Sequence, residues 1–123
     1  MTNQPITVWT EVPVTDMERA VTFYNTVFGY EMAIDTTGPN PMAVFGNNMN
    51  TVGGHLYPGT PGTAGNGPTV HLALPDTLEA GIERCTKAGG QVISRAIEIP
   101  PGRFAYAIDP DGNSLGLFEP KAA

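Results

Sequence analysis

The chain has 123 residues, of which 41% are hydrophobic and 15% are charged, and its formal net charge is −6 at pH 7. This length and composition predict one small globular domain, and the acidic balance excludes the basic surface that a nucleic-acid-binding protein needs. The sequence shows no export signal, no apolar run of membrane-spanning length and a single cysteine, which together favour a cytoplasmic protein with no membrane partner.

The first predicted element is a strand over residues 6–14, because hydrophobic side chains occupy alternate positions. The side chains that share one face of this strand are Ile6, Val8, Val12 and Val14. Trp9 and Glu11 share the opposite face. We expect the hydrophobic face to pack against the helix that follows.

That helix is predicted to begin at Thr15, because Thr15 and Glu18 form a capping box that satisfies free amide groups in the first turn. Its apolar face consists of residues at helical spacing: Met17, Ala20, Val21, Tyr24, Val27 and Phe28. Gly29 should end the helix, since glycine readily adopts the left-handed conformation of a C-terminal cap.

Three further strands are predicted in the first half, over residues 30–35, 42–45 and 51–57, with turn sequences between them. Residues 58–68 are rich in Gly, Pro and Thr, a composition that builds no packed element. We therefore interpret this segment as a linker between two halves of the chain.

The second half repeats this order of elements. A strand precedes a helix that has a capping pattern at Asp76 and Glu79 and ends at Gly89. A strand over residues 91–99 follows. A hairpin over residues 104–118 completes the half, and its turn is the sequence Asp-Pro-Asp-Gly-Asn, in which proline and glycine favour a tight reversal.

Matching positions in the two halves support an internal duplication. In the first half, Trp9 and Glu11 lie seven and five residues before the acidic residue at the helix start. In the second half, Thr69 and His71 lie seven and five residues before the corresponding acidic residue. Each half is therefore interpreted as strand–helix–strand–strand–strand.

Several stretches give nearly the whole chain a resemblance to the vicinal oxygen chelate superfamily, the group of glyoxalase I, bleomycin-resistance proteins and extradiol dioxygenases. They are residues 14–24 with Phe28 and Gly29, residues 88–90, and the hairpin of residues 104–120. The resemblance implies an α+β fold of two βαβββ modules, residues 1–60 and 66–120, whose mixed sheets curl around a shared cleft.

In the superfamily the strand face opposite each helix lines the cleft, which implies that Trp9, Glu11, Thr69 and His71 point into it. A small molecule is the partner expected for such a cleft. Open sheet edges and a small core also predict a homodimer, with modules paired within one chain or between two chains.

Metal-dependent members of the superfamily hold one divalent ion with His and Glu side chains from the first and last strands of each module. The resemblance places these positions at Trp9, His55, Thr69 and Gly116. Tryptophan and glycine side chains cannot ligate a metal and threonine seldom does, so only His55 keeps a metal-binding group. We therefore expect neither the usual metal nor another cofactor.

A displaced metal site is the alternative, because Glu11, His55 and His71 would supply two histidines and one carboxylate. In the opposing interpretation, His71 is a hydrogen-bonded strand histidine and His55 is exposed. Glu11 is unusual in an apolar strand, where an unpaired carboxylate is costly to bury. It is either functional, paired with Arg103 or Lys87, or exposed at the rim of the sheet.

The candidate catalytic residues are therefore Glu11, as a general base or acceptor, and His71, as its partner across the cleft. The candidates for ligand binding are Trp9, His55, Thr69, Arg103 and Phe118. Aromatic side chains can supply walls for a planar or apolar ligand, and Arg103 is suited to clamp a carboxylate. The opposing roles are core packing for the aromatic residues and simple solvation for the arginine.

The predicted function is that of a small-molecule-binding protein, similar to glyoxalases and bleomycin-resistance proteins, that works without the usual metal. Two alternatives stay open. One is a divalent-metal-dependent lyase, isomerase or dioxygenase that uses the displaced site. The other is a resistance protein that sequesters a drug in an acidic cleft. The sequence names no substrate, because this fold hosts many chemistries.

Overall fold

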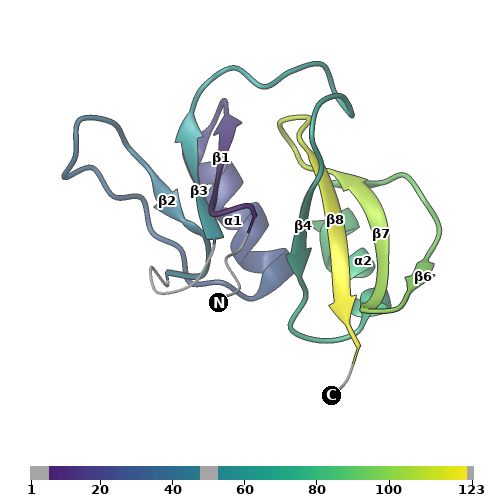
Figure 1. Ribbon diagram of the computed structural model, residues 1–123. Coiled ribbons are helices and arrows are strands. Elements are labelled where there is room, and N and C mark those ends of the chain that lie inside the picture. Colours follow the sequence, from purple (N-terminus) through teal and green to yellow (C-terminus); the bar gives the residue numbers. More distant parts are fainter. Residues whose placement is uncertain (1–5, 48–52, 122–123) are drawn as a thin grey trace.

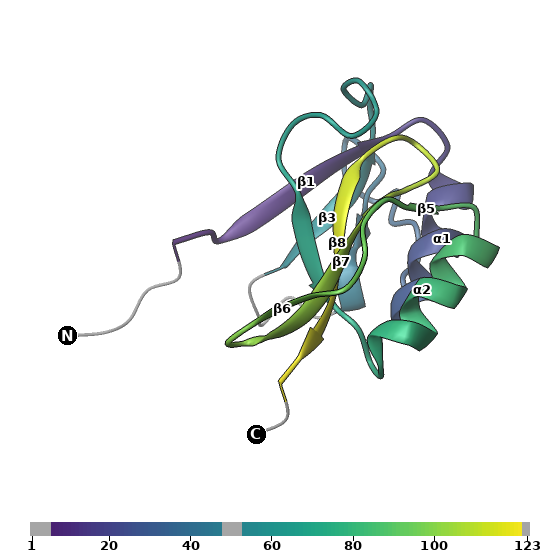
Figure 2. The ribbon, with the colours of Figure 1, turned by 90° about the vertical axis from the view of Figure 1, so that its right-hand side faces the viewer.

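The computed structural model describes residues 6–47 and 53–121, and it shows an α+β chain whose two sheets stand side by side (Figure 1). One helix accompanies each sheet, and both helices lie on the same side of the two sheets (Figure 2). In the part of the chain that is described, no helix has the length and apolar content needed to cross a lipid bilayer.

The first half forms a three-stranded sheet in the order β1–β3–β2. Its elements are β1 (Trp9–Val14), α1 (Met17–Phe28), β2 (Ala43–Val44), a 3₁₀ turn (Phe45–Asn47) and β3 (Gly53–Pro58). β1 runs parallel to β3, and β2 runs antiparallel to it. A parallel pair needs a long crossover connection, and α1 lies within that connection.

The second half forms a five-stranded sheet in which β4, β8, β7 and β5 are neighbours in that order and β6 also pairs with β7. Its elements are β4 (Val70–Ala73), α2 (Leu78–Lys87), β5 (Gln91–Val92), β6 (Ile97–Ile99), β7 (Gly102–Ile108) and β8 (Ser114–Pro120). β4 runs parallel to β8, as β1 does to β3. The predicted α+β fold is therefore confirmed.

The core lies between the two helices and the sheet faces that they cover. The helices bury Ala20, Phe23, Tyr24, Val27, Phe28, Leu78, Gly81 and Cys85. The strands contribute Val12, Val14, Leu56, Ala105, Ala107, Leu115 and Leu117. Because successive strand residues point to opposite faces, the residues between these core positions point away from the helices. That outer face carries the candidate site.

The first strand begins later than predicted. Ile6 and Val8 were expected to share the buried face with Val12 and Val14, but they are 102% and 63% exposed. The reason is that the described pairing with β3 begins only at Trp9, so no described strand or helix covers the two earlier side chains. This segment extends away from the body of the molecule (Figure 2).

The strand predicted over residues 30–35 is reduced to a single bridge between Asp35 and Met42. The side-chain amide of Asn25, in α1, forms hydrogen bonds with the backbone of this segment instead. Its Oδ1 accepts a hydrogen bond from the Met32 amide at 2.8 Å, and its Nδ2 donates to the Met32 carbonyl at 3.2 Å. A helix side chain thus satisfies groups that a strand partner would otherwise bind.

Both helices are capped one residue later than predicted. Asp16, and not Thr15, is the N-cap of α1, and its carboxylate accepts a hydrogen bond from a first-turn amide at 3.1 Å. Thr77, and not Asp76, is the N-cap of α2. Gly29 ends α1 as predicted, with a φ of 72° in the left-handed region.

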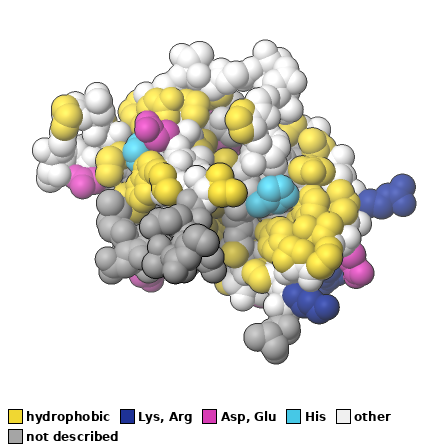
Figure 3. Space-filling model, in the orientation of Figure 1, with side chains coloured by type: hydrophobic (Ala, Val, Ile, Leu, Met, Phe, Trp, Pro, Cys, Tyr) yellow, Lys and Arg dark blue, Asp and Glu magenta, His cyan; other side chains and the backbone are white. Residues whose placement is uncertain are grey.

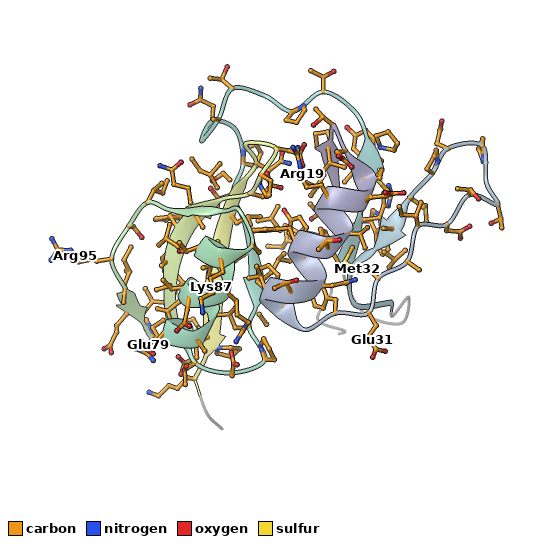
Figure 4. All side chains as sticks on the ribbon, turned by 180° about the vertical axis from the view of Figure 1, so that it is seen from behind. Arg19, Glu31, Met32, Glu79, Lys87 and Arg95 are labelled. Carbon is orange, nitrogen blue, oxygen red and sulfur yellow. The ribbon has the colours of Figure 1, made fainter. Side chains whose placement is uncertain are left out.

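The turn between β7 and β8 connects the two halves. Asp111 in this turn accepts hydrogen bonds from the amide and hydroxyl groups of Thr15, and it pairs with Arg19 at 2.7 Å. Figure 4 shows Arg19 on α1 at the end near this turn. Asn113 Nδ2 also donates to the carbonyl of Pro13 at 2.9 Å. A turn in the second half therefore anchors the start of the helix in the first half.

Candidate functional site

An aromatic cluster covers the outer face of the second sheet. Its members are His71 of β4, Phe104 and Tyr106 of β7, and Phe118 of β8. The ring centroids of His71 and Phe104 are 4.8 Å apart and nearly perpendicular, and those of Phe104 and Phe118 are 6.0 Å apart and stacked. Figure 3 shows hydrophobic side chains gathered beside a histidine on this face. The arrangement forms an aromatic wall outside the core.

Gly116 gives His71 its position over this wall. The two residues are directly opposite each other where β4 pairs with β8. A Cβ atom at residue 116 would collide with the His71 imidazole, so the ring lies where a side chain is missing. The glycine at one of the expected metal positions thus makes room for a histidine ring.

The His71 ring is suited to exchange hydrogen bonds with a ligand. Partial burial lowers its pKa below the ordinary value, so the imidazole is neutral at pH 7. A neutral imidazole donates one hydrogen bond and accepts another. Among the described residues, the ring makes aromatic contacts but no hydrogen bond, and its Nδ1 edge lies against Gly116.

On the outer face of the first sheet, Trp9 and Glu11 of β1 lie beside His55 of β3. Trp9 Nε1 donates a hydrogen bond to His55 Nδ1 at 2.9 Å, and Glu11 Oε1 lies 3.9 Å from His55 Nε2. The His55 side chain is 15% exposed, whereas that of Glu11 is 64% exposed. The histidine is therefore held in place, and the carboxylate can reach solvent or a ligand.

A hollow of about 640 Å³ opens beside this histidine. It is lined by Glu11, Asp35, Met42, His55, Tyr57, Pro58 and residues 37–41. None of the described residues that line it is a lysine or arginine, and hydrogen bonds from Thr37 lower the pKa of Asp35. The first hollow is therefore acidic, which disfavours anionic ligands.

A second hollow, of about 840 Å³, lies between the two sheets. Thr10, Tyr30 and Phe45 line it from the first half, and Thr69 and His71 from the second. Of the two predicted catalytic residues, His71 lines this second hollow and Glu11 lines the hollow beside His55.

The residues at the expected metal positions do not fit a metal ion. The Nδ1 atom of His55 already accepts the indole hydrogen, Thr69 is hydrogen-bonded to a serine at 2.6 Å, and the space at Gly116 holds the His71 ring. Over residues 6–47 and 53–121, no three His, Cys, Asp or Glu side chains gather in a way that could hold an ion. In the described structure, His71 is not grouped with Glu11 and His55.

Arg103 lies on the other face of the second sheet, beside the start of α2. Its guanidinium group donates to Glu79 at 2.6 and 2.7 Å and to Glu119 at 3.0 Å. Figure 4 shows Glu79 near the start of this helix. These bonds raise the pKa of Arg103 and lower that of Glu79. The predicted carboxylate clamp therefore holds carboxylates of the chain itself.

The other predicted ligand-binding residues divide between the two sheets. Trp9 and His55 lie together on the first sheet, Thr69 lines the second hollow, and Phe118 belongs to the aromatic cluster. The hydrogen bond between Trp9 and His55 was not predicted from the sequence. The only signal for it would have been the pairing of β1 with β3, which places Glu11 opposite His55 and Trp9 two residues earlier on the same face.

Known proteins resemble this chain over most of its length. A glyoxylase-like domain-containing protein of Didymella fabae is 31% identical over 117 residues, which cover 87% of this chain and 88% of that protein. The CFP32 protein of Mycobacterium bovis is 29% identical over 119 residues, which cover 90% of this chain and 44% of that protein. The chain thus spans less than half the length of this second relative.

A solved structure and a family model also match this chain over most of its length. TnmS3, an antibiotic binding protein from Streptomyces sp. CB03234, is 26% identical, and the match covers 98% of this chain and 100% of TnmS3 with a TM-score of 0.65. The model of the Glyoxalase/Bleomycin resistance protein/Dioxygenase superfamily matches residues 6–117. The sequence resemblance is therefore confirmed, and the chain belongs to the Glyoxalase/Bleomycin resistance protein/Dioxygenase superfamily.

Proposed function

We propose that this chain binds a planar aromatic small molecule and releases it unchanged, without the metal ion that related enzymes use. The observation that carries the proposal is the aromatic cluster. Tyr106 and Phe118 are only half-buried, so parts of their rings remain open on the outer face of the sheet. Such rings make stacked and edge-to-face contacts with an aromatic ligand, and they dominate the walls of small-molecule sites.

His71 would orient the bound ligand. Its neutral ring lies among the aromatic side chains, and Nε2, the nitrogen farther from Gly116, would exchange a hydrogen bond with the ligand. A few polar groups on an apolar wall give a binding site its specificity. The cluster therefore has both components that a specific aromatic site requires.

Two further observations support binding in preference to metal-assisted catalysis. Trp9, Thr69 and Gly116 supply no strong metal ligand, so a metal-dependent lyase, isomerase or dioxygenase would lack its ion. TnmS3, whose match covers nearly this whole chain, is named as an antibiotic binding protein. Sequestration of an aromatic drug is one form of the proposed function.

A thermal-shift screen of planar aromatic compounds, antibiotics included, tests the proposal. A compound at 100 times its Kd should stabilise the protein by about 2.7 kcal/mol, and mass spectrometry should recover it intact. Phe118→Ala should weaken binding about tenfold or more, because a large apolar contact is lost. Ile34→Ala is the control, since Ile34 is an exposed hydrophobic residue of the first half, away from the aromatic cluster.

The proposal is overturned if every bound compound is converted to product, or if Phe118→Ala and Ile34→Ala bind equally well. Elemental analysis after expression with added Zn²⁺, Mn²⁺, Fe²⁺ and Ni²⁺ tests the metal-dependent alternative. We expect no stoichiometric ion. One tightly held ion per chain that is lost in Glu11→Ala or His71→Ala would establish the displaced-site metalloenzyme instead.

A further inference from the structure

The Trp9–His55 hydrogen bond determines which nitrogen of His55 carries the proton. An indole N–H is a donor only, so the His55 Nδ1 atom, 2.9 Å from Trp9 Nε1, must be the acceptor. A neutral imidazole has one protonated nitrogen, and here that nitrogen is Nε2. His55 therefore presents an N–H donor at its other edge.

This tautomer explains why a histidine at an expected metal position is not a metal ligand. A metal ion needs a nitrogen lone pair. The lone pair of Nδ1 is occupied by the indole hydrogen, and Nε2 carries a proton in place of a lone pair. The side chain is only 15% exposed, and Trp9 and Tyr57 contact its ring, so free rotation to another arrangement is restricted.

The Nε2–H group and the Glu11 carboxylate form a donor–acceptor couple at the edge of the first hollow. Nε2 and Glu11 Oε1 are 3.9 Å apart. This distance is too long for a direct hydrogen bond, but one oxygen atom can lie within hydrogen-bond distance of both atoms. A hydroxyl group fits the couple, because it can accept from Nε2–H and donate to the carboxylate at once.

We propose that Trp9 is a positioning residue that holds His55 as an Nε2–H donor, so that His55 and Glu11 together bind a hydroxyl group of a small molecule in the first hollow. A ligand carbonyl or ether oxygen would satisfy only the histidine, and an ammonium group only the glutamate. The couple therefore selects an alcohol or a phenol. This selection rests on the proposed small-molecule function, whereas the assignment of the tautomer does not.

NMR of the ring nitrogens in the unliganded protein tests the tautomer. The chain has two histidines, so the signals can be assigned with a His71→Gln variant. We expect His55 to be protonated at Nε2 in the wild type and to become a mixture of tautomers in Trp9→Phe, which keeps an aromatic ring but removes the indole N–H. Tyr57→Phe is the control, because Tyr57 contacts the His55 ring without hydrogen-bonding to it in the described structure.

The tautomer assignment is overturned if wild-type His55 is protonated at Nδ1, or if Trp9→Phe leaves its spectrum unchanged. A loss of folding in Trp9→Phe would be detected by the His71 signals, which report on the other sheet. In that event the wild-type spectrum alone decides the assignment.

Binding of phenol and anisole tests the selection for a hydroxyl group, because anisole accepts a hydrogen bond but donates none. Phenol should shift the His55 Nε2 signal and bind about tenfold more tightly than anisole, since it gains a hydrogen bond to a charged acceptor. Glu11→Ala should remove this preference. Equal affinities, or no shift at His55, overturn the selection. Probe binding that shifts His71 alone would support the proposed function and still refute the hydroxyl site.

Discussion

At the scale of single residues, Gly116 and His71 connect two features of the chain. One is the missing metal-binding side chain at residue 116, and the other is the aromatic cluster that we propose binds a ligand. The glycine removes one expected metal ligand and also leaves the space that the imidazole occupies. The ring then makes edge contacts with three aromatic side chains: Phe104, Tyr106 and Phe118. One small residue thus opens the space that the imidazole fills in the aromatic cluster.

Replacing Gly116 with alanine should displace the His71 ring, because the new Cβ would overlap the imidazole. We expect the free energy of unfolding to fall by about 1–3 kcal/mol, the usual cost of overpacking, in urea denaturation. Gly53→Ala is the matched control, since a Cβ at this strand glycine would have no neighbour within 4 Å. Equal effects in both variants would show that the two side chains do not compete for space.

The lowered pKa of His71 predicts a specific pH dependence of stability. The folded ring resists protonation, so below the ordinary value of 6.5 the unfolded chain binds more protons than the folded one. Stability should therefore be highest above that pH and fall as the pH decreases through it. In urea denaturation between about pH 7 and pH 5, His71→Gln should show a smaller decrease than the wild type. Parallel curves would mean that the ring is fully solvated.

At the scale of elements, the turn between β7 and β8 is a structural connection between the two halves of the chain. The carboxylate of Asp109 accepts hydrogen bonds from the amides of Asp111 and Asn113 at 2.9 and 2.8 Å, which fixes the shape of the turn. The buried hydroxyl of Tyr24 donates to the same carboxylate at 2.7 Å. The turn is thereby tied to α1, which belongs to the other half.

Removing the Asp111 side chain should weaken this connection. The side chain has 0% exposure, and Asp111→Ala leaves the Thr15 hydroxyl without its acceptor and the Arg19 guanidinium without its carboxylate partner. We expect a loss of about 1–3 kcal/mol in urea denaturation. Glu83→Ala is the control, because its pair with Lys87 is exposed on both sides and such pairs contribute about 0.5 kcal/mol or less. A loss as small as the control's would show that the halves associate without this turn.

At the scale of the whole molecule, the described N-terminal segment predicts a homodimer. Ile6 and Val8 continue the alternation of the buried residues of β1, yet no described residue of their own chain buries them. Such apolar side chains on an extended segment are suited to contact a second copy. Analytical ultracentrifugation should show a dimer, and Ile6→Asp with Val8→Asp should weaken it, whereas Thr7→Asp should not. Sedimentation as a monomer at every concentration would contradict this assembly.

Local patterns in the sequence determined the fold class and, for most strand and helix residues, whether the side chain points to the core or to the outer face. The side-chain periodicity of a strand or helix depends only on residues that are close in sequence. The alternation around Val12 and Val14 and the spacing of apolar residues along α1 therefore predicted their buried faces directly. The same alternation placed Trp9 with Glu11 and Thr69 with His71 on the outer faces. The division into modules of residues 1–60 and 66–120 is an extension of this pattern and stays a prediction.

Only the tertiary structure decided which of these outward residues meet. Trp9 and His55 are 46 positions apart, and their hydrogen bond depends on the parallel pairing of β1 with β3. Arg103 was predicted to meet a ligand, but the neighbouring helix supplies Glu79 to it at 2.6 Å. Contacts of this kind depend on the packing of distant elements, which local periodicity does not encode. The periodic pattern of the sequence therefore predicted which residues face outward. The pairing of distant elements decided which of these residues come together, and so which chemical groups each outer face presents.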